Sequence, residues 1–278
     1  MNILATFAIA LLASILYFTF FLSLSIRFKK HWYLNLAWST SFLVIYLLSL
    51  AINRSPGFKQ SFIFLMILLW SLRLSFYLII RNINKEDLNY KNLNEVFKSK
   101  LLINIFIKLI LPLAVASLLI NSAAIIASTY NQFTRIEILD IAAAVIWMLG
   151  FLLESIADLE LFKFKSNTLN KDRILRVGLW NHSRHPNYLG EILQWSATCL
   201  AVITLSYGIV SLLSPLVLIL WLFKFNILSK AENKLSNKFE YQEYKKETPI
   251  LIPTKYIYSR LTALIQNLKK LRKNTTSI

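Results

Sequence analysis

The stretch GLWNHSRHPNYLGEILQW, residues Gly178–Trp195, marks the point where a polar loop turns into a membrane helix. Histidine, arginine and asparagine side chains fill its first half, and an apolar run continues beyond Trp195. Pro186 suits the first turn of a helix, because proline has no backbone N–H to leave unpaired there. We therefore expect a loop up to His185, followed by a helix that carries polar groups into the bilayer.

The composition predicts an all-α, polytopic membrane protein. The chain has 278 residues, of which 56% are hydrophobic, and its mean hydropathy is +0.53. A soluble domain of this size does not usually carry so many apolar residues. Several apolar runs reach the roughly 20 residues that a helix needs to cross a bilayer.

The apolar runs predict about seven transmembrane helices. They cover about residues 3–26, 33–52, 61–80, 101–127 and 138–161, then 186 to the Tyr207-Gly208 turn, and from that turn to 229. We expect a kink at Pro112. No polar linker divides the chain, so we expect one membrane-embedded domain over residues 1–278. Residues 230–278 form a basic tail, in which residues 256–273 have the spacing of an interfacial helix. A disordered basic tail is the alternative.

The net charge of +17 would suggest nucleic acid as the partner of a soluble protein. In a membrane protein the positive-inside rule explains it, because the excess of Lys and Arg falls on alternate loops. This pattern places the amino terminus outside and the carboxyl terminus in the cytoplasm. The first 26 residues carry no charged side chain and therefore lack the basic region of a cleavable signal. The single cysteine, Cys199, excludes disulfides and cysteine metal sites.

Polar side chains recur at helical spacing in three of the predicted spans. They are Arg73 and Tyr77 in the third, Glu154 and Asp158 in the fifth, and Asn187, Glu191 and Gln194 in the sixth. Ionisable groups inside a membrane are costly and point to function. A polar cavity between these helices is one interpretation, and ion pairs that hold the bundle together are the other.

Tyr77 and the loop after its helix are candidate catalytic groups. Tyr77 can donate a hydrogen bond or a proton to a substrate oxygen, with Arg73 one turn away. A tyrosine that anchors the helix at the membrane interface is the alternative. Glu86 and Tyr90 are more exposed candidates, and a solvated charged loop explains them equally well.

A strongly basic loop precedes Pro186. Its cations are Lys163, Lys165, Lys171, Arg173, Arg176 and Arg184. Arginine suits phosphate oxygens, and a helix start also favours anions, although the positive-inside rule would place cations here too. His182 and His185 lack a third ligand, so we expect no metal and read His185 as a helix cap or a cofactor contact. No glycine-rich nucleotide motif is present, so a nucleotide would bind without a Rossmann turn.

Several stretches together resemble the steroid 5α-reductase superfamily, in its uncharacterised bacterial branch. They are Gly178–Trp195, LWSLRLSFYLIIR (69–81), KEDLNY (85–90), ESIADLELFKFK (154–165) and ENKLSNKFEYQEYKKETPILIP (232–253). The set is specific for the superfamily and not for a substrate. The resemblance implies a seven-helix bundle in the bacterial inner membrane that encloses NADPH from the cytoplasmic side.

The resemblance also implies roles for single residues. Asn187 and Glu191 match the motif N-x-x-G-E, whose Asn and Glu hold the nicotinamide, and Tyr188 lies within that motif. Arg173 matches a phosphate-contacting arginine, with Arg184 and His185 as further cofactor contacts. The remaining matches are Asp158 and Lys165 for the cofactor wall, Tyr244 for a tail tyrosine that closes over the cofactor, and Tyr77 for the tyrosine facing the substrate carbonyl. Gln194 and Glu154 depart from the steroid enzymes, which have Glu and Asn there, and the second span offers no match for the Glu that partners the substrate tyrosine.

SRHPNY (183–188) also resembles the R-H-P-x-Y motif of membrane methyltransferases that use S-adenosylmethionine. Their tails share a pattern seen here in Glu232, Tyr241 and Tyr244. Two features favour the reductases: Gly190-Glu191 follows Asn187, and the basic loop suits a phosphate-rich cofactor.

From these residues we expect an NADPH-dependent oxidoreductase that acts on a CH–CH group of a lipophilic enone. The alternatives are a methyltransferase that uses S-adenosylmethionine on a lipid or isoprenylated substrate, and a non-enzymatic lipid-binding or scaffold protein. The expected partners are the lipophilic substrate and membrane lipid, with no nucleic acid and no metal.

Overall fold

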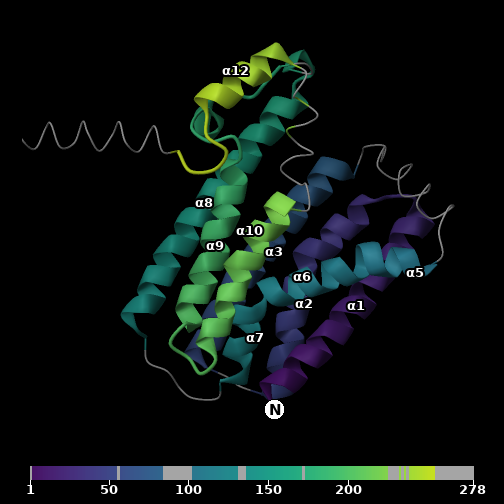
Figure 1. Cartoon of the computed structure of the whole chain (residues 1–278), viewed down its shortest axis with the longest axis vertical. Coiled ribbons are helices and arrows are strands. Elements are labelled where there is room, and N and C mark those ends of the chain that lie inside the picture. Colours follow the sequence, from purple (N-terminus) through teal and green to yellow (C-terminus); the bar gives the residue numbers. More distant parts are fainter. Residues whose placement is uncertain are drawn as a thin grey trace, which may run out of the picture. The chain divides into compact units, whose positions relative to one another are not determined.

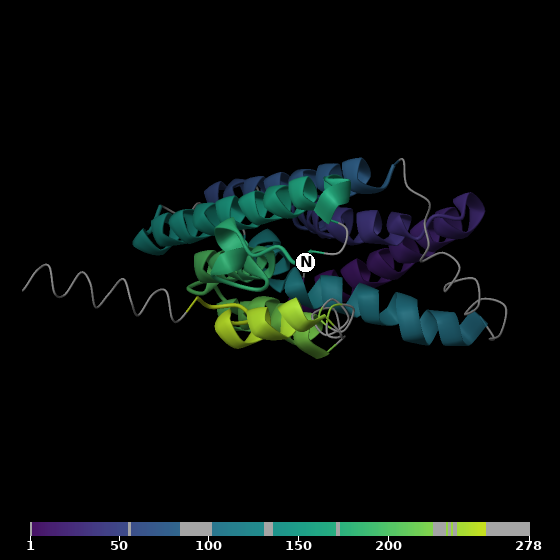
Figure 2. The same ribbon diagram turned by 90° about the horizontal axis from the view of Figure 1, so that it is seen from above.

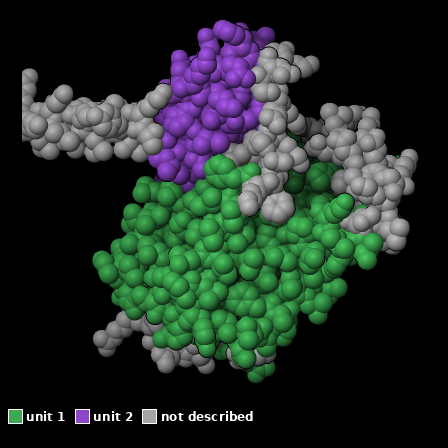
Figure 3. Space-filling model, in the orientation of Figure 1, with its two compact units in different colours: residues 1–151, 192–227 green, residues 152–191, 228–278 purple. Residues whose placement is uncertain are grey.

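The computed structural model describes residues 2–54, 57–83, 102–130, 136–170, 173–224, 232, 235 and 238–253. Within these ranges the chain is helical and contains no strand (Figure 1), which confirms the all-α prediction. The chain divides into two compact units, coloured separately in Figure 3. Unit 1 comprises residues 1–151 and 192–227, unit 2 comprises residues 152–191 and 228–278, and each is described by itself.

Three long helices open unit 1. They are α1 (Ile3–Phe28), α2 (Trp32–Asn53) and α3 (Phe58–Asn82), each within a few residues of its predicted span. Lys29 and Arg54 end the first two in the left-handed conformation, and their N–H groups bond to carbonyls of the last turn. The helix α2 packs against both α1 and α3, and the three run alongside one another in Figure 2.

The fourth apolar segment is broken. It contains α5 (Leu102–Ile105), a π-helical turn η1 (Phe106–Ile110), α6 (Leu111–Ile120) and α7 (Ser122–Thr129). The π turn directly precedes Pro112, whose missing N–H interrupts the ladder of α-helical hydrogen bonds. The sharp bend of 55° lies further along, between α6 and α7. There the Asn121 amide Nδ2 donates to the Phe42 carbonyl of α2 (2.8 Å), so a side chain fastens the break to a neighbouring helix.

The last long helices are α8 (Ile138–Ser166), α9 (Pro186–Val202) and α10 (Leu213–Lys224). Between α9 and α10, Tyr207 has a φ of 63° and leads into the short η4 helix (Gly208–Leu212). A Cβ atom on Gly208 would overlap the carbonyl oxygens of Val202 and Ile203, so the close turn requires glycine.

In the described part of the chain, four helices are long and apolar enough to cross a membrane, or five if the bent pair counts as one span. They are α1, α2, α3 and α8, and the bent pair is η1–α6 with α7. Large apolar side chains such as Leu16, Phe20 and Phe76 are exposed, as expected for helices that face lipid. The chain is therefore a multi-pass membrane protein.

Unit 1 also contains a buried ion pair between the ends of its helices. The Lys59 ammonium, 1% exposed, lies 2.8 Å from Asp140 Oδ1 and donates to the Ala201 carbonyl at 3.1 Å. Asp140 Oδ2 accepts the backbone N–H of Glu137 (2.9 Å). The pair joins the start of α3, the start of α8 and the end of α9, and no sequence motif indicates it.

Candidate functional site

The loop before α9 is held on α8 by backbone geometry and by two side-chain bonds, all in unit 2. Gly178 begins the short η3 helix (Gly178–Asn181) with a φ of 60°, and a Cβ atom there would overlap the Glu160 carboxylate. Glu160 Oε2 instead accepts the Leu179 N–H at 3.0 Å. The Trp180 indole N–H donates to the Ala157 carbonyl at 3.1 Å.

Helix α12 (Phe239–Glu247) fastens the same loop from its other side. The Tyr244 hydroxyl donates to the Trp180 carbonyl and lies 3.3 Å from the Ser183 carbonyl. Beyond the helix, the Pro249 carbonyl accepts the Arg184 N–H at 2.9 Å. Burial raises the pKa of Tyr244, so the hydroxyl keeps its proton and stays a donor. The resemblance implies that Tyr244 closes over the cofactor. In the structure its hydroxyl bonds to the backbone of the loop.

An ion cluster lies between the loop and residue 232. The Arg184 guanidinium donates to Glu232 Oε1, and His185 Nε2 lies 3.3 Å from the same oxygen. The side chains are nearly buried, at 9% exposed for Arg184 and His185 and 13% for Glu232. Burial lowers the pKa of His185, although Glu232 opposes the shift. The imidazole is therefore neutral near pH 7.

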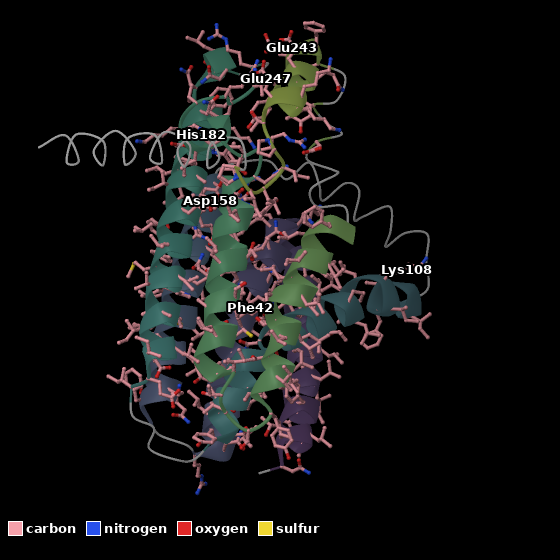
Figure 4. All side chains as sticks on the ribbon, turned by 60° about the vertical axis from the view of Figure 1, so that its left-hand side comes forward. Phe42, Lys108, Asp158, His182, Glu243 and Glu247 are labelled. Atoms are coloured by element: carbon pink, nitrogen blue, oxygen red, sulfur yellow. The ribbon has the colours of Figure 1, made fainter. Side chains whose placement is uncertain are left out.

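Asn187 and Asp158 meet inside unit 2, one from the first turn of α9 and the other from α8. Asn187 Nδ2 donates to Asp158 Oδ1 at 3.2 Å. Figure 4 labels Asp158 on its helix and His182 in the loop. Asn187 Oδ1 is buried and has no hydrogen-bond partner among the described residues. The amide is therefore oriented by one bond and keeps a free acceptor.

The remaining cofactor candidates differ in exposure. The Tyr188 ring stacks on the His185 ring at 5.4 Å, and Glu191 is partly exposed one helical turn after Asn187. Arg173 and Lys165 are exposed.

Arg176 connects the loop to α12. Its guanidinium lies 2.6 Å from Glu247 Oε2 and 5.6 Å from the centre of the Tyr244 ring. This cation therefore joins the loop to α12, and Arg173 and Lys165 are the more accessible cations for an anionic ligand.

The candidate catalytic residues belong to unit 1 or lie outside the described ranges. The Arg73 guanidinium lies 5.9 Å from the centre of the Phe151 ring, and Arg81 lies 5.8 Å from the centre of the Tyr77 ring. Both Arg73 and Tyr77 are half-buried on α3. Glu86 and Tyr90 fall in residues 84–101, which are outside the described part, as are Lys171 and the predicted interfacial helix at 256–273.

Sequence reasoning missed the residues that shape the loop. Glu160 and Trp180 support it, and although both lie in stretches that carry the resemblance, no role was predicted for either. Glu232 entered only through the methyltransferase pattern, whereas the structure brings it against Arg184 and His185. In the described ranges, no three His, Cys, Asp or Glu side chains are close enough to hold a metal ion.

Comparison with known proteins identifies a family. The family model described as "Protein of unknown function (DUF1295)" matches residues 20–248, which include every candidate site residue. This family lies among the steroid 5α-reductase-like membrane proteins, which confirms the resemblance at that level. No curated protein and no solved structure matches the chain significantly.

Proposed function

Because the chain belongs to this family of steroid 5α-reductase-like membrane proteins, we propose that it is an NADPH-dependent reductase of a lipophilic enone. The observation that carries the proposal is the half-buried Asn187 amide, which Asp158 orients and whose buried oxygen has no partner among the described residues. An amide oxygen left unpaired in a buried site costs about 1–3 kcal/mol. A ligand that donates an N–H to it would recover this free energy.

The nicotinamide carboxamide is such a ligand. Its NH2 group would donate to Asn187 Oδ1, and Glu191, one turn later on the same helix face, would accept the second N–H. Asp158 would hold the Asn187 side chain in this orientation through the existing 3.2 Å bond. This arrangement also explains why a carboxylate lies beside an amide in an apolar bundle, because each group satisfies part of the other's hydrogen-bonding capacity.

Arg173 and Lys165 are the cations best placed for the cofactor phosphates, since both are exposed. Arg184 already pairs with Glu232, so its charge is partly neutralised before any ligand arrives. In this proposal Arg184 contacts a phosphate while Glu232 keeps its guanidinium oriented, and His185 with Tyr188 forms the adjoining wall.

Bound NADPH would supply a hydride to the electron-poor carbon of the enone. Tyr77 would donate a hydrogen bond to the carbonyl oxygen and so stabilise the negative charge that develops there. Arg73 would support that charge through the field of its guanidinium. The proposal includes seven membrane spans with the amino terminus outside, which places the loop before α9 at the cytoplasmic face of a bacterial inner membrane.

A thermal-shift experiment on the full chain in detergent tests the proposal. NADPH should raise the melting temperature, and S-adenosylmethionine should not. Asn187→Ala should weaken NADPH binding by about tenfold, the ratio expected for one buried hydrogen bond, whereas the exposed Asn181→Ala should leave it unchanged. Stabilisation by S-adenosylmethionine alone would refute the reductase, and stabilisation by neither would point to a non-enzymatic lipid-binding protein.

One observation favours the methyltransferase as a second candidate. Glu232, from the tail pattern shared with those enzymes, pairs with Arg184 of the R-H-P-x-Y motif. Such an enzyme would use the Glu232 carboxylate to bind the positively charged end of S-adenosylmethionine. Glu232→Gln would then abolish stabilisation by S-adenosylmethionine, whereas for the reductase the same change should leave NADPH bound.

A further inference from the structure

A lysine on the π-helical turn η1 is exposed within an apolar segment of unit 1. The segment is LINIFIKLILPLAVASLLI, residues 102–120, and Lys108 is its only charged side chain. Phe106 and Ile107, which precede the exposed Lys108, are themselves 40% and 51% exposed. A charged side chain on the lipid-facing surface of a membrane helix is costly and points to a function.

The π turn brings these exposed residues to one side. Its hydrogen bond runs from the Leu111 N–H to the Phe106 carbonyl, five residues back, whereas an α-helix bonds to the fourth residue back. Residues three or four apart share a face of a regular helix, yet here Ile105 and Ile110, five apart, are both buried. The wider turn therefore leaves residues 106–108 together on the outer side. Turns of this kind are frequent at functional sites.

The packing of η1 places Lys108 near one end of the membrane helices. The two buried isoleucines of the turn lie in one cluster with Leu22, near the end of α1, and with Leu34, in the first turn of α2. The connection between α1 and α2, residues 27–31, carries three Lys or Arg side chains and a histidine. Basic residues beside a membrane helix mark its boundary with water. A long lysine side chain at this depth can therefore extend to the lipid headgroups.

The direction of the segment agrees with this position. In Figure 1 the segment α5–η1–α6 runs across α2, whereas α1, α2 and α3 run alongside one another. Figure 4 labels Lys108 on the part of this segment that projects from the long helices. A helical segment with exposed apolar residues beside a cation is typical of the membrane interface, where the apolar side chains enter the acyl region and the cation meets anionic lipid.

The charge of Lys108 is complementary to a lipid phosphate. None of the described helices from α1 to α7 contains Asp or Glu, so no carboxylate of these helices neutralises it. In unit 1, Asp140 contacts Lys59 at the start of α3, which follows the opposite end of α2. At the boundary near Lys108, the phosphate of a membrane lipid is the anion at hand, and basic residues beside a membrane attract anionic lipids.

We propose that Lys108 binds the phosphate of an anionic phospholipid, whose acyl chain contacts Phe106 and Ile107. Ile103, 59% exposed and four residues before Ile107, extends this apolar contact along the same face. A zwitterionic lipid carries its own cation beside the phosphate and gains less from the lysine. The site is separate from the proposed cofactor and substrate residues, so it stands or falls independently of the proposed function.

Native mass spectrometry of the full chain in detergent tests the inference. The probes are dioleoylphosphatidylglycerol, which is anionic, and dioleoylphosphatidylcholine, which is zwitterionic. Lys108→Gln should weaken binding of the anionic lipid about fivefold, which corresponds to about 1 kcal/mol for one basic residue near an anionic lipid surface. The same change should leave binding of the zwitterionic lipid nearly the same.

Two further variants show whether the site or the total charge matters. Lys108→Arg keeps the positive charge and should keep the affinity for the anionic lipid. Lys163→Gln removes another exposed lysine, from the last turn of α8, and should not change that affinity. If Lys163→Gln weakened binding as much as Lys108→Gln, general attraction to a basic protein would be the cause and the inference would fail. A loss with Lys108→Arg would also overturn it, since charge would then not be what the lipid recognises.

Competition with inorganic phosphate separates a lipid site from a site for any anion. Excess phosphate should not displace the lipid, because the apolar side chains also hold the acyl chain. Displacement would overturn the assignment to a phospholipid. Equal binding of the two lipids, unaffected by Lys108→Gln, would mean that the lysine extends only into water, and would overturn the site.

Discussion

The two units each contain a nearly buried pair of a cation and a carboxylate, and the pairs differ in how completely they are satisfied. Lys59 in unit 1 contacts Asp140 and the Ala201 carbonyl, and both side chains are at most 2% exposed. Arg184 in unit 2 pairs with Glu232, but its Nε is buried without an acceptor among the described residues.

This difference distinguishes a closed pair from an open one, whose cation has a buried donor without an acceptor among the described residues. A closed pair recovers the cost of removing two charges from water only through its own bonds. In the pair of unit 2 the Arg184 Nε–H has no acceptor among the described residues, and Glu232 also faces His185 and, at 4.0 Å, Lys245. In the proposed function this pair would contact a phosphate group of the cofactor.

The largest effect is expected at the closed pair. Lys59→Met leaves the Asp140 charge buried without its cation and should lower the free energy of unfolding by about 3–5 kcal/mol. Thermal unfolding in detergent measures this, and Lys59→Met with Asp140→Leu should recover much of the loss. A loss of under about 1 kcal/mol would mean that the pair is no more structural than an exposed one.

The loop that carries the open pair should respond next. Gly178→Ala puts a side chain at a φ of 60° and against the Glu160 carboxylate, which should cost about 1–3 kcal/mol. Adding Glu160→Ala removes the overlap but not the unfavourable φ, so stability should return only in part. Full recovery would show that contact with Glu160, and not the backbone conformation, demands glycine.

At the open pair itself the effect on stability should be smaller than at the closed pair. Glu232→Gln keeps a hydrogen-bond acceptor for Arg184 but removes the charge that compensates a nearly buried cation, so we expect a loss of about 1–3 kcal/mol. The freed Arg184 should bind anions more tightly, which titration with inorganic pyrophosphate would detect. If the change destabilised the protein as much as Lys59→Met, the contrast between the two pairs would be lost.

The smallest effect concerns pH. The pKa of His185 is lowered in the folded protein, so below its ordinary value of about 6.5 the unfolded chain binds the proton more readily. Stability should therefore fall as the pH drops below about 6.5 and be fully present above it. His185→Gln should flatten this part of the stability profile, and an unchanged slope would assign it to other groups. Lys59→Met supplies a control, since it should shift the profile without changing this slope.

Most of the helices could be predicted from the sequence, but the break in the fourth apolar segment could not. The helices α1, α2, α3 and α8 could be predicted closely, because long apolar runs in lipid have one stable backbone conformation. The bend at Asn121 could not, since no proline or glycine marks it. Asparagine there stabilises the break through a bond to Phe42, a residue far away in the sequence.

The residues of the candidate site could be predicted from the sequence, whereas the contacts between them could not. Asn187, Glu191 and Asp158 could be named from spacing and resemblance, because residues one turn apart lie on one helix face. The bond between Asn187 and Asp158 and the pairing of Arg184 with Glu232 are tertiary facts.

The sequence by itself determined the class of the protein, the position of most helices and the loop that precedes α9. Hydrophobicity and helical periodicity are local properties, so they can be read along the chain. Only the tertiary structure decided which ion pair is closed, which is open, and which buried polar atoms lack a partner among the described residues. Those properties depend on what surrounds each group, and the surrounding residues come from distant parts of the sequence.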